Sequence, residues 1–179
     1  MSLMGKWMNP DLAQSLEPLH RDAYGWALHC CGDHPTEAGD VLQNAYLKVM
    51  QGKARYSEIA SLKTWWFGVI RLTAREEQRR RRFRISFVGK VLNFSTPGAD
   101  PAPSALAVIA LAEEVAELKR CLAQLPPRQA EVLHLVFYQD LSVSEAAAVM
   151  QVSIGSARTH YDRAKSRLRE LLAPSRTKP

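Results

Sequence analysis

Four residues with metal-binding or redox chemistry lie close together in the sequence: His29, Cys30, Cys31 and His34. Imidazole and thiolate groups are ligands that zinc prefers in proteins. The surrounding pattern, however, predicts a helix that ends near Cys31, and neighbouring residues on a helix diverge by about 100°. Few of these side chains can converge on one ion, and no carboxylate or further ligand follows at a suitable spacing. We therefore expect small buried thiols and surface imidazoles here, with no metal, no cofactor and no catalytic site.

A different chemistry, binding to a polyanion, is indicated by two basic segments. The 179 residues carry a formal net charge of +6. Residues 71–90 hold eight Lys or Arg and two Glu, a local charge of +6, and residues 158–178 hold seven Lys or Arg and two acids, a local charge of +5. The rest of the chain therefore has a formal net charge of −5. An acidic body with two separate basic segments is typical of a protein that contacts nucleic acid at two places. The alternative is a structural adaptor whose basic faces are only solvated.

The second basic segment contains the pattern of a helix-turn-helix. Ser142 and Glu145 have the spacing of a capping box, in which each side chain binds the backbone amide of the other residue. A short helix to Met150, a turn over residues 151–153 and a longer helix to Leu172 follow. Two helices joined by a short turn, the second with a basic outer face, predict DNA binding in the major groove. An ordinary helical hairpin with a solvated face is the alternative.

The longer helix has two distinct faces. Its apolar residues recur at steps of three and four, which predicts one narrow buried stripe. The stripe comprises Ile154, Ala157, Tyr161, Ala164, Leu168 and Leu171. The opposite face comprises Ser156, Thr159, Asp162, Arg163 and Ser166, and Arg158 flanks it.

The N-terminal half begins with helices whose outer faces are less charged. A helix from Pro10 to about Cys31 is expected to kink at Pro18, and a turn leads to a helix over residues 35–51. The core stripe of this second helix is Ala38, Val41, Leu42, Ala45 and Val49. Its opposite face holds Asp40, Gln43, Asn44 and Leu47. An exposed leucine among polar groups is either a surface accident or part of a docking face for another helix.

The first basic segment follows a loop that contains Tyr56. A helix starting near Ser61 is expected to place Leu62, Trp65, Trp66, Val69 and Thr73 inward. Its outward residues are expected to be Lys63, Phe67, Arg71, Ala74, Arg75 and Gln78, followed by an arginine run that includes Arg82. An exposed aromatic with spaced arginines suits phosphates and unstacked bases. A solvated helix end without a partner is the alternative.

These patterns predict an all-α protein of two small helical domains joined by a flexible linker, the C-terminal domain being the helix-turn-helix. We place the domains at residues 9–86 and 105–173 and the linker at residues 87–104, because residues 95–104 have the composition of a linker. After residue 104 a helix with Leu106, Ile109, Ala110, Val115, Leu118 and Leu122 in its stripe is expected. A further helix after Pro126–Pro127 is expected to turn Ala130, Leu133, Val136 and Phe137 toward the helix-turn-helix. No run has the length of a membrane span, and three cysteines fit a reducing cytoplasm.

Taken in order, these features resemble the extracytoplasmic-function (ECF) group of bacterial sigma factors. Residues 37–46 (EAGDVLQNAY) are similar to that family's polymerase-binding helix, and Trp65–Trp66–Phe67 through Arg71 is similar to its helix for the −10 element. Residues 125–132 (LPPRQAEV) and 154–158 (IGSAR) are similar to its −35-binding domain. The chain departs from the family where Gly39 and Asn44 replace frequent acids, Leu72 replaces a frequent asparagine and Gln151 replaces a common turn glycine.

The resemblance implies a sigma factor that binds core RNA polymerase and directs promoter recognition, DNA melting and initiation. It implies polymerase contact through Asp40, Gln43, Asn44 and Leu47. For promoter DNA it implies Tyr56, Lys63, Phe67, Arg71, Arg75, Gln78, Arg82, Ser156, Arg158, Thr159 and Arg163. An anti-sigma factor is implied as a further partner, with no small-molecule substrate, and the free protein is expected to be a monomer. The alternative function is a helix-turn-helix regulator that does not bind core polymerase. Such a regulator would have the same helix-turn-helix. The N-terminal half, however, shows neither the pattern of a receiver domain nor a ligand-pocket signature.

Overall fold

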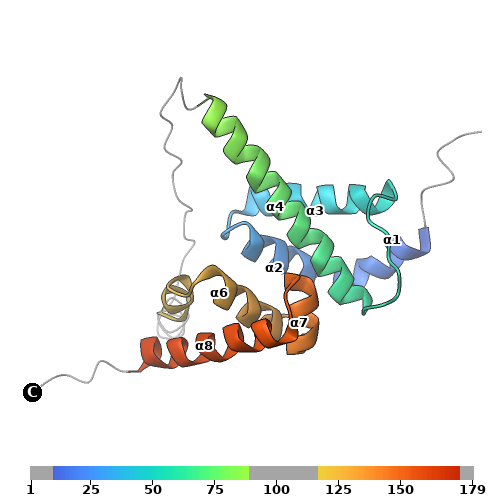
Figure 1. Cartoon of the computed structure of the whole chain (residues 1–179). Helices are drawn as coiled ribbons and strands as arrows, with labels where there is room; N and C mark the ends of the chain where they lie inside the picture. Colours follow the sequence, from blue (N-terminus) through green and yellow to red (C-terminus); the bar gives the residue numbers. More distant parts are fainter. Residues whose placement is uncertain (1–9, 89–116, 174–179) are drawn as a thin grey trace, which may run out of the picture. The chain divides into compact units, whose positions relative to one another are not determined.

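Every regular element of the computed structural model is a helix within the residues that it describes, 10–88 and 117–173 (Figure 1). This confirms the predicted all-α class. The chain divides into two compact units, one centred on α1–α4 and the other on α6–α8. Residues 89–104 of the predicted linker and the stripe residues Leu106, Ile109, Ala110 and Val115 lie outside the described residues, so the domain boundaries stay a prediction.

The N-terminal unit opens with a helix that is interrupted where proline was expected to kink it. α1 spans Pro10–Leu16, a 3₁₀ helix spans Glu17–Leu19, and α2 spans His20–Cys30. Because proline has no backbone N–H and clashes with the preceding turn, the regular α-helix cannot continue through Pro18. The turn after α2 uses the left-handed region, with φ of 63° at Gly32 and 62° at Asp33.

α3 spans Pro35–Met50 and has the two faces that its sequence predicts. Its start is favoured by proline at the first helical position, whose fixed φ suits a helix. The five residues of the predicted core stripe are all buried: Ala38, Val41, Leu42, Ala45 and Val49.

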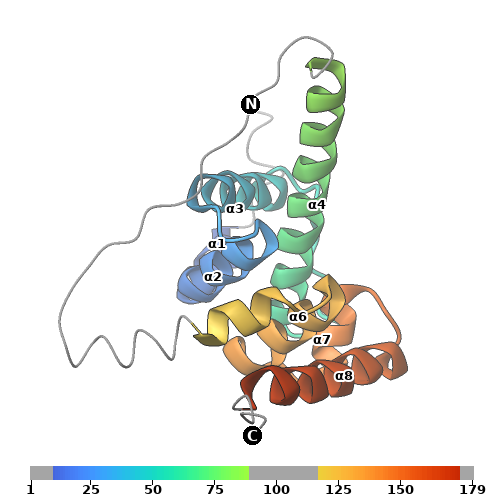
Figure 2. The same cartoon turned by 90° about the vertical axis from the view of Figure 1, so that its left-hand side faces the viewer.

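α4 spans Leu62–Val88 and packs against both α2 and α3 (Figure 1, Figure 2). Ser61 caps it, accepting a hydrogen bond from the Thr64 amide at 3.2 Å. The prediction that Phe67, Arg71 and Ala74 point outward is wrong, since they are 0%, 1% and 2% exposed. A single stripe was assumed, but a helix held between two neighbours buries a much wider arc. Trp65, predicted to face inward, is only half-buried.

The C-terminal unit forms the predicted helix-turn-helix. α7 spans Val143–Met150 and α8 spans Ile154–Leu172. The capping box is present: the Glu145 amide donates to Ser142 Oγ at 3.2 Å, and the Ser142 amide donates to Glu145 Oε2 at 3.0 Å. Gln151 adopts a left-handed φ of 56° in the turn, the conformation for which glycine is the usual choice.

The core of this unit lies under α8. Before it come a helix over residues 117–123, α6 at Pro127–Leu133 and a π-helix at His134–Tyr138. Leu125, Leu133 and Ala164 form a buried cluster, and Leu122, Ala130, Tyr161, Leu168 and Leu171 pack against it.

Two predicted core residues are exposed instead, Ile154 at 51% and Phe137 at 60%. Ile154 is the first residue of α8, at the edge of the packed face. Phe137 belongs to the π-helix, whose wider turn departs from the 3.6-residue period on which its inward orientation was predicted.

Candidate functional site

The outer face of α8 is polar and exposed. Ala157 and Ala164 are fully buried, which brings the helix close to its neighbours on one side. Ser156, Arg158, Thr159 and Arg163 are all exposed on the other side. Ser153 caps the helix, accepting a hydrogen bond from the Ser156 amide at 3.1 Å. The DNA-binding residues predicted on α8 are thus all exposed, with Arg158 at the flank of the face that holds Ser156, Thr159 and Arg163.

Charge on α8 is divided between paired and available cations. Lys165 lies 3.2 Å from Asp162, and Arg167 lies 3.1 Å from Glu170, each pair one turn apart. Within the described part of the chain, Arg158 and Arg163 have no acidic side chain within ion-pair distance. These two guanidinium groups can therefore bind a phosphate or a guanine edge without first breaking an internal ion pair.

The face of α3 opposite its core stripe is the second surface. Asp40, Gln43 and Leu47 are exposed, Leu47 at 41%, and Asn44 is half-buried. One acid and two amides surround an apolar side chain that the fold does not cover. Such a surface suits a partner helix that offers both a complementary charge and an apolar contact.

On α4 the structure separates the predicted DNA-binding residues. Arg75 and Arg82 are exposed, whereas Phe67 and Arg71 are buried. Lys63 Nζ pairs with Asp22 of α2 at 2.8 Å and lies 5.6 Å from the Phe67 ring centroid. Gln78 Nε2 donates to the Cys30 carbonyl, at the end of α2, at 2.8 Å. Lys63 and Gln78 thus hold α4 against α2.

Sequence reasoning missed two members of the exposed face of α4, Leu72 and Arg79. Together with Arg75 they recur at steps of three and four, so the spacing of a single helical stripe was present in the sequence. To recognise this stripe as the exposed face of α4, one has to know that α4 is packed on two sides.

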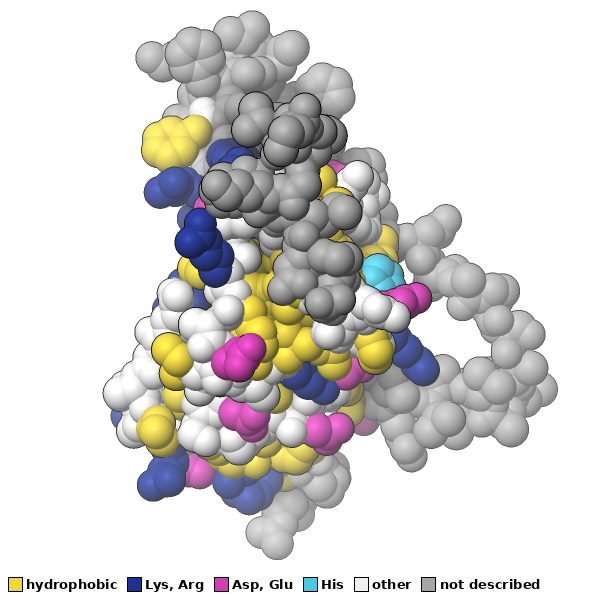
Figure 3. Space-filling model, turned by 90° about the vertical axis from the view of Figure 1, so that its right-hand side faces the viewer, with side chains coloured by type: hydrophobic (Ala, Val, Ile, Leu, Met, Phe, Trp, Pro, Cys, Tyr) yellow, Lys and Arg dark blue, Asp and Glu magenta, His cyan; other side chains and the backbone are white. Residues whose placement is uncertain are grey.

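The rest of the arginine run is only partly available. Arg80 pairs with Glu77 at 2.9 Å, and Arg81 pairs with Glu37 of α3. Phe83 is 70% exposed. Figure 3 shows dark blue Lys and Arg side chains beside an exposed hydrophobic ring at the upper left, over the C-terminal part of α4. This end of α4 therefore offers cations and an aromatic surface together.

The loop between α3 and α4 does not offer Tyr56 as a free aromatic. Its hydroxyl donates to the Ala60 carbonyl at 2.8 Å, and its ring centroid lies 5.2 Å from that of Trp65. The exposed apolar residue of this loop is Ile59, at 90%.

The cysteine and histidine residues near Gly32 are dispersed. Cys30 and Cys31 are free thiols, and the His29 ring stacks on Trp26 with centroids 5.5 Å apart. Burial raises the pKa of the Cys31 thiol, and the positive charge of Arg81 opposes that rise. Among residues 10–88 and 117–173, no three His, Cys, Asp or Glu side chains are placed to hold a metal ion. No helix there is long and apolar enough to cross a membrane.

Two family models match separate stretches of this chain. The model described as "Sigma-70 region 2" matches residues 16–84, and the model described as "Sigma-70, region 4" matches residues 116–168. The chain is 27% identical over 135 residues to the ECF RNA polymerase sigma factor EcfG of Rhodopseudomonas palustris, covering 75% of this chain and 71% of the relative. It is 25% identical over 166 residues to the RNA polymerase sigma factor YlaC of Bacillus subtilis, covering 90% and 94%.

A solved structure shares the fold. The sigma factor RpoE of Bartonella quintana, crystallised in complex with the anti-sigma factor NepR, superimposes with a TM-score of 0.69 at 23% identity. The match covers 93% of this chain and 99% of that one.

Proposed function

This chain belongs to the ECF group of the sigma-70 family, and from that premise we propose how its surfaces share the work of a sigma factor. A sigma factor binds core RNA polymerase and directs it to promoters, where the DNA is opened and transcription begins. Members of the family are non-catalytic initiation factors. They melt promoter DNA with binding energy and not through a covalent step. We place this work in the cytoplasm, where core polymerase and promoter DNA meet.

The outer face of α8 reads the upstream promoter element. Arg158 and Arg163 supply positive charge that is not committed to internal acids, and Ser156 and Thr159 supply short hydroxyl groups near the start of the helix. A helix inserted in the major groove brings its N-terminal residues to base edges. We therefore assign Ser156, Arg158 and Thr159 to positions near bases, and Arg163 to a phosphate.

The exposed stripe of α4 holds the region that melts. Leu72, Arg75 and Arg79 form the outward row, and Arg82 with Phe83 continues the cationic, aromatic surface beyond it. Cations attract the phosphates of a separated strand, and an aromatic ring offers a face to unstacked bases. Phe67 and Arg71 act in the core of this unit, and Tyr56 supports the loop against Trp65.

The outer face of α3 docks on core polymerase. The observation that carries this assignment is the exposure of Asp40, Gln43 and Leu47 on a helix whose other face is fully committed to the core. An anti-sigma factor is a further partner, since the related RpoE was solved with one.

Core-polymerase binding by Asp40→Lys tests the proposal against a helix-turn-helix regulator that does not bind polymerase. A repulsive charge at a buried hot spot costs about 2–4 kcal/mol, roughly thirty- to a thousand-fold in affinity. Glu17→Lys makes the same charge change at an exposed site outside α3 and should bind as the wild type does. Both variants should melt at the wild-type temperature. Wild-type affinity of Asp40→Lys at every salt concentration would contradict this docking face.

A further inference from the structure

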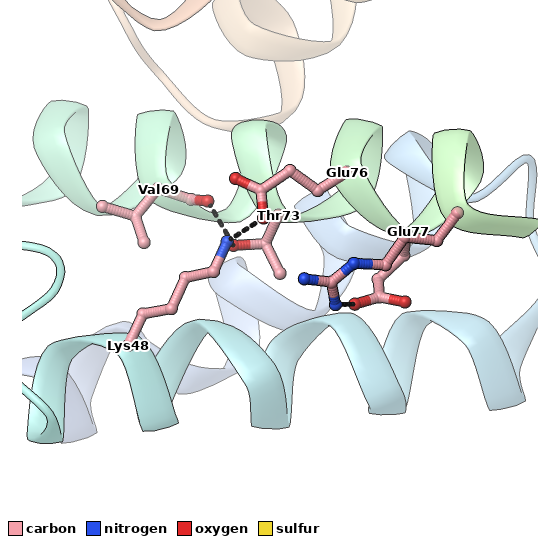
Figure 4. Close-up of polar contacts among 6 residues, drawn as sticks. Lys48, Val69, Thr73, Glu76 and Glu77 are labelled. Atoms are coloured by element: carbon pink, nitrogen blue, oxygen red, sulfur yellow. Dashed lines mark hydrogen bonds and ion pairs between the residues drawn. The ribbon is translucent and has the colours of Figure 1, made fainter.

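A polar network joins α3 to α4 between the two surfaces assigned above. Lys48 Nζ of α3 donates to Thr73 Oγ1 at 3.0 Å and to Glu76 Oε2 at 2.8 Å, both on α4 (Figure 4). Thr73 is 1% exposed, and its hydroxyl donates to the Val69 carbonyl at 2.9 Å. The buried hydroxyl is thus satisfied as donor and as acceptor, which fixes the end of the lysine side chain.

A second polar contact joins the same two helices at the opposite end of α3, where Glu37 pairs with Arg81. The interface also includes ring packing, with the centroids of Tyr46 on α3 and Trp66 in the N-terminal part of α4 lying 4.8 Å apart. Apolar contacts are not directional, so they tolerate a small rotation or slide of one helix on the other. Hydrogen bonds weaken steeply when their angles change, and these polar contacts therefore set the register of α4 on α3.

The network residues are neighbours of both assigned surfaces. Lys48 follows Leu47 directly and lies one turn after Asn44, on the polymerase-facing helix. On α4, Thr73 directly follows Leu72 and Glu76 directly follows Arg75 in the sequence. We propose that Lys48, Thr73 and Glu76 form a positioning clamp, which fixes the rotation of the Leu72–Arg75–Arg79 row relative to the polymerase-binding face. This proposal rests on the function assigned above.

The competing explanation is that the Lys48–Glu76 pair is only one of several ion pairs that hold the helices together. The chain contains a closely matched pair for comparison, Lys63–Asp22. Both pairs have N–O distances of 2.8 Å and join α4 to another helix. Their side chains are 26% and 42% exposed in the first pair, and 25% and 44% exposed in the second. If only stability mattered, equivalent changes in the two pairs would have equivalent effects.

The test compares Glu76→Gln with Asp22→Asn in the full chain, assembled with core polymerase on a promoter that the wild type opens. We expect Glu76→Gln to slow promoter opening about three- to tenfold, the scale of one weakened hydrogen bond to a charged group. Core affinity and melting temperature should equal those of Asp22→Asn. The direction of the change in opening rate is informative. Removing a negative charge beside Arg75 would by itself strengthen binding to phosphates, so this charge effect alone does not predict slower opening.

A charge exchange provides the rescue. Lys48→Glu combined with Glu76→Lys restores an ion pair across the same two helices, and it should open promoters faster than either single variant. Opening by Glu76→Gln at the Asp22→Asn rate, or a double variant as slow as the slower single variant, would overturn the clamp. A wild-type protein that opens no promoter with core polymerase would overturn the function itself, so the two failures are distinguishable.

Discussion

α4 and α8 are both long, arginine-rich helices, and they differ in how much of their circumference is buried. α4 packs on α2 and on α3, and its Lys63, Arg80 and Arg81 pair with acids. α8 packs against α6 through its apolar stripe, and its outward Arg158 and Arg163 have no acidic partner within the described residues. Similar charge in the sequence therefore yields different charge at the surface.

The difference follows from the width of the buried arc. α8 buries one narrow stripe and leaves the rest of its surface for a partner. The buried residues of α4 extend around a much wider arc, so that some of its polar residues become part of the interior. Arg71 illustrates this outcome, at 1% exposed in the middle of α4.

The largest effect is expected where the burial of α4 is tested directly. Phe67→Ala should destabilise the N-terminal unit by about 3–5 kcal/mol, because it removes a fully buried ring that stacks on Trp26. Leu72→Ala, on the exposed row, should cost roughly 1 kcal/mol or less. Urea unfolding followed by tryptophan fluorescence reports this unit alone, since all four tryptophans precede Phe67. Equal midpoints for the two variants would show that Phe67 is not a core residue.

A smaller effect is expected on α8, in DNA affinity rather than stability. Arg158→Ala should weaken binding to the upstream element by about 1–3 kcal/mol if the guanidinium pairs with a base edge. Arg167→Ala is the control, since Arg167 is half-exposed and engaged with Glu170. The measurement is the binding affinity of each variant on matched and scrambled elements. Unchanged affinity of Arg158→Ala on every sequence would remove Arg158 from the interface.

The smallest effect is expected within α4, in the salt dependence of DNA binding, where Arg79 is compared with the ion-paired Arg80. Arg79→Ala should lower the slope of log affinity against log salt by about 0.7–0.9 for a promoter whose −10 region is single-stranded, as expected for one lost phosphate contact. Arg80→Ala should change that slope much less, because Arg80 is committed to Glu77. Equal changes in slope would mean that the internal pair does not restrict Arg80.

The elements that could be predicted from the sequence are those set by local interactions or by one narrow apolar stripe. The Ser142–Glu145 capping box, the α3 stripe and the outward face of α8 all follow from the 3.6-residue period and from side chains a few residues apart. The interruption at Pro18 also has a local cause. In each case side chains a few residues apart, or a single apolar stripe, indicate the outcome.

The residues that were misplaced depend on tertiary structure. Phe67 and Arg71 sit on an arc that is buried only because both α2 and α3 cover α4. Lys63 and Gln78 donate hydrogen bonds to residues that lie 41 and 48 positions away in the sequence. The exposure of Phe137 reflects a π-helix, for which the local sequence carries no periodic signal.

Run-off transcription on a pool of genomic promoters tests the central claim most directly, with core polymerase alone and with this chain added. The account predicts transcripts that start at defined sites only when both are present, and that are lost with Asp40→Lys but retained with Glu17→Lys. Start-site-specific transcripts that do not depend on the chain, or their absence when a known sigma factor is active under the same conditions, would contradict it.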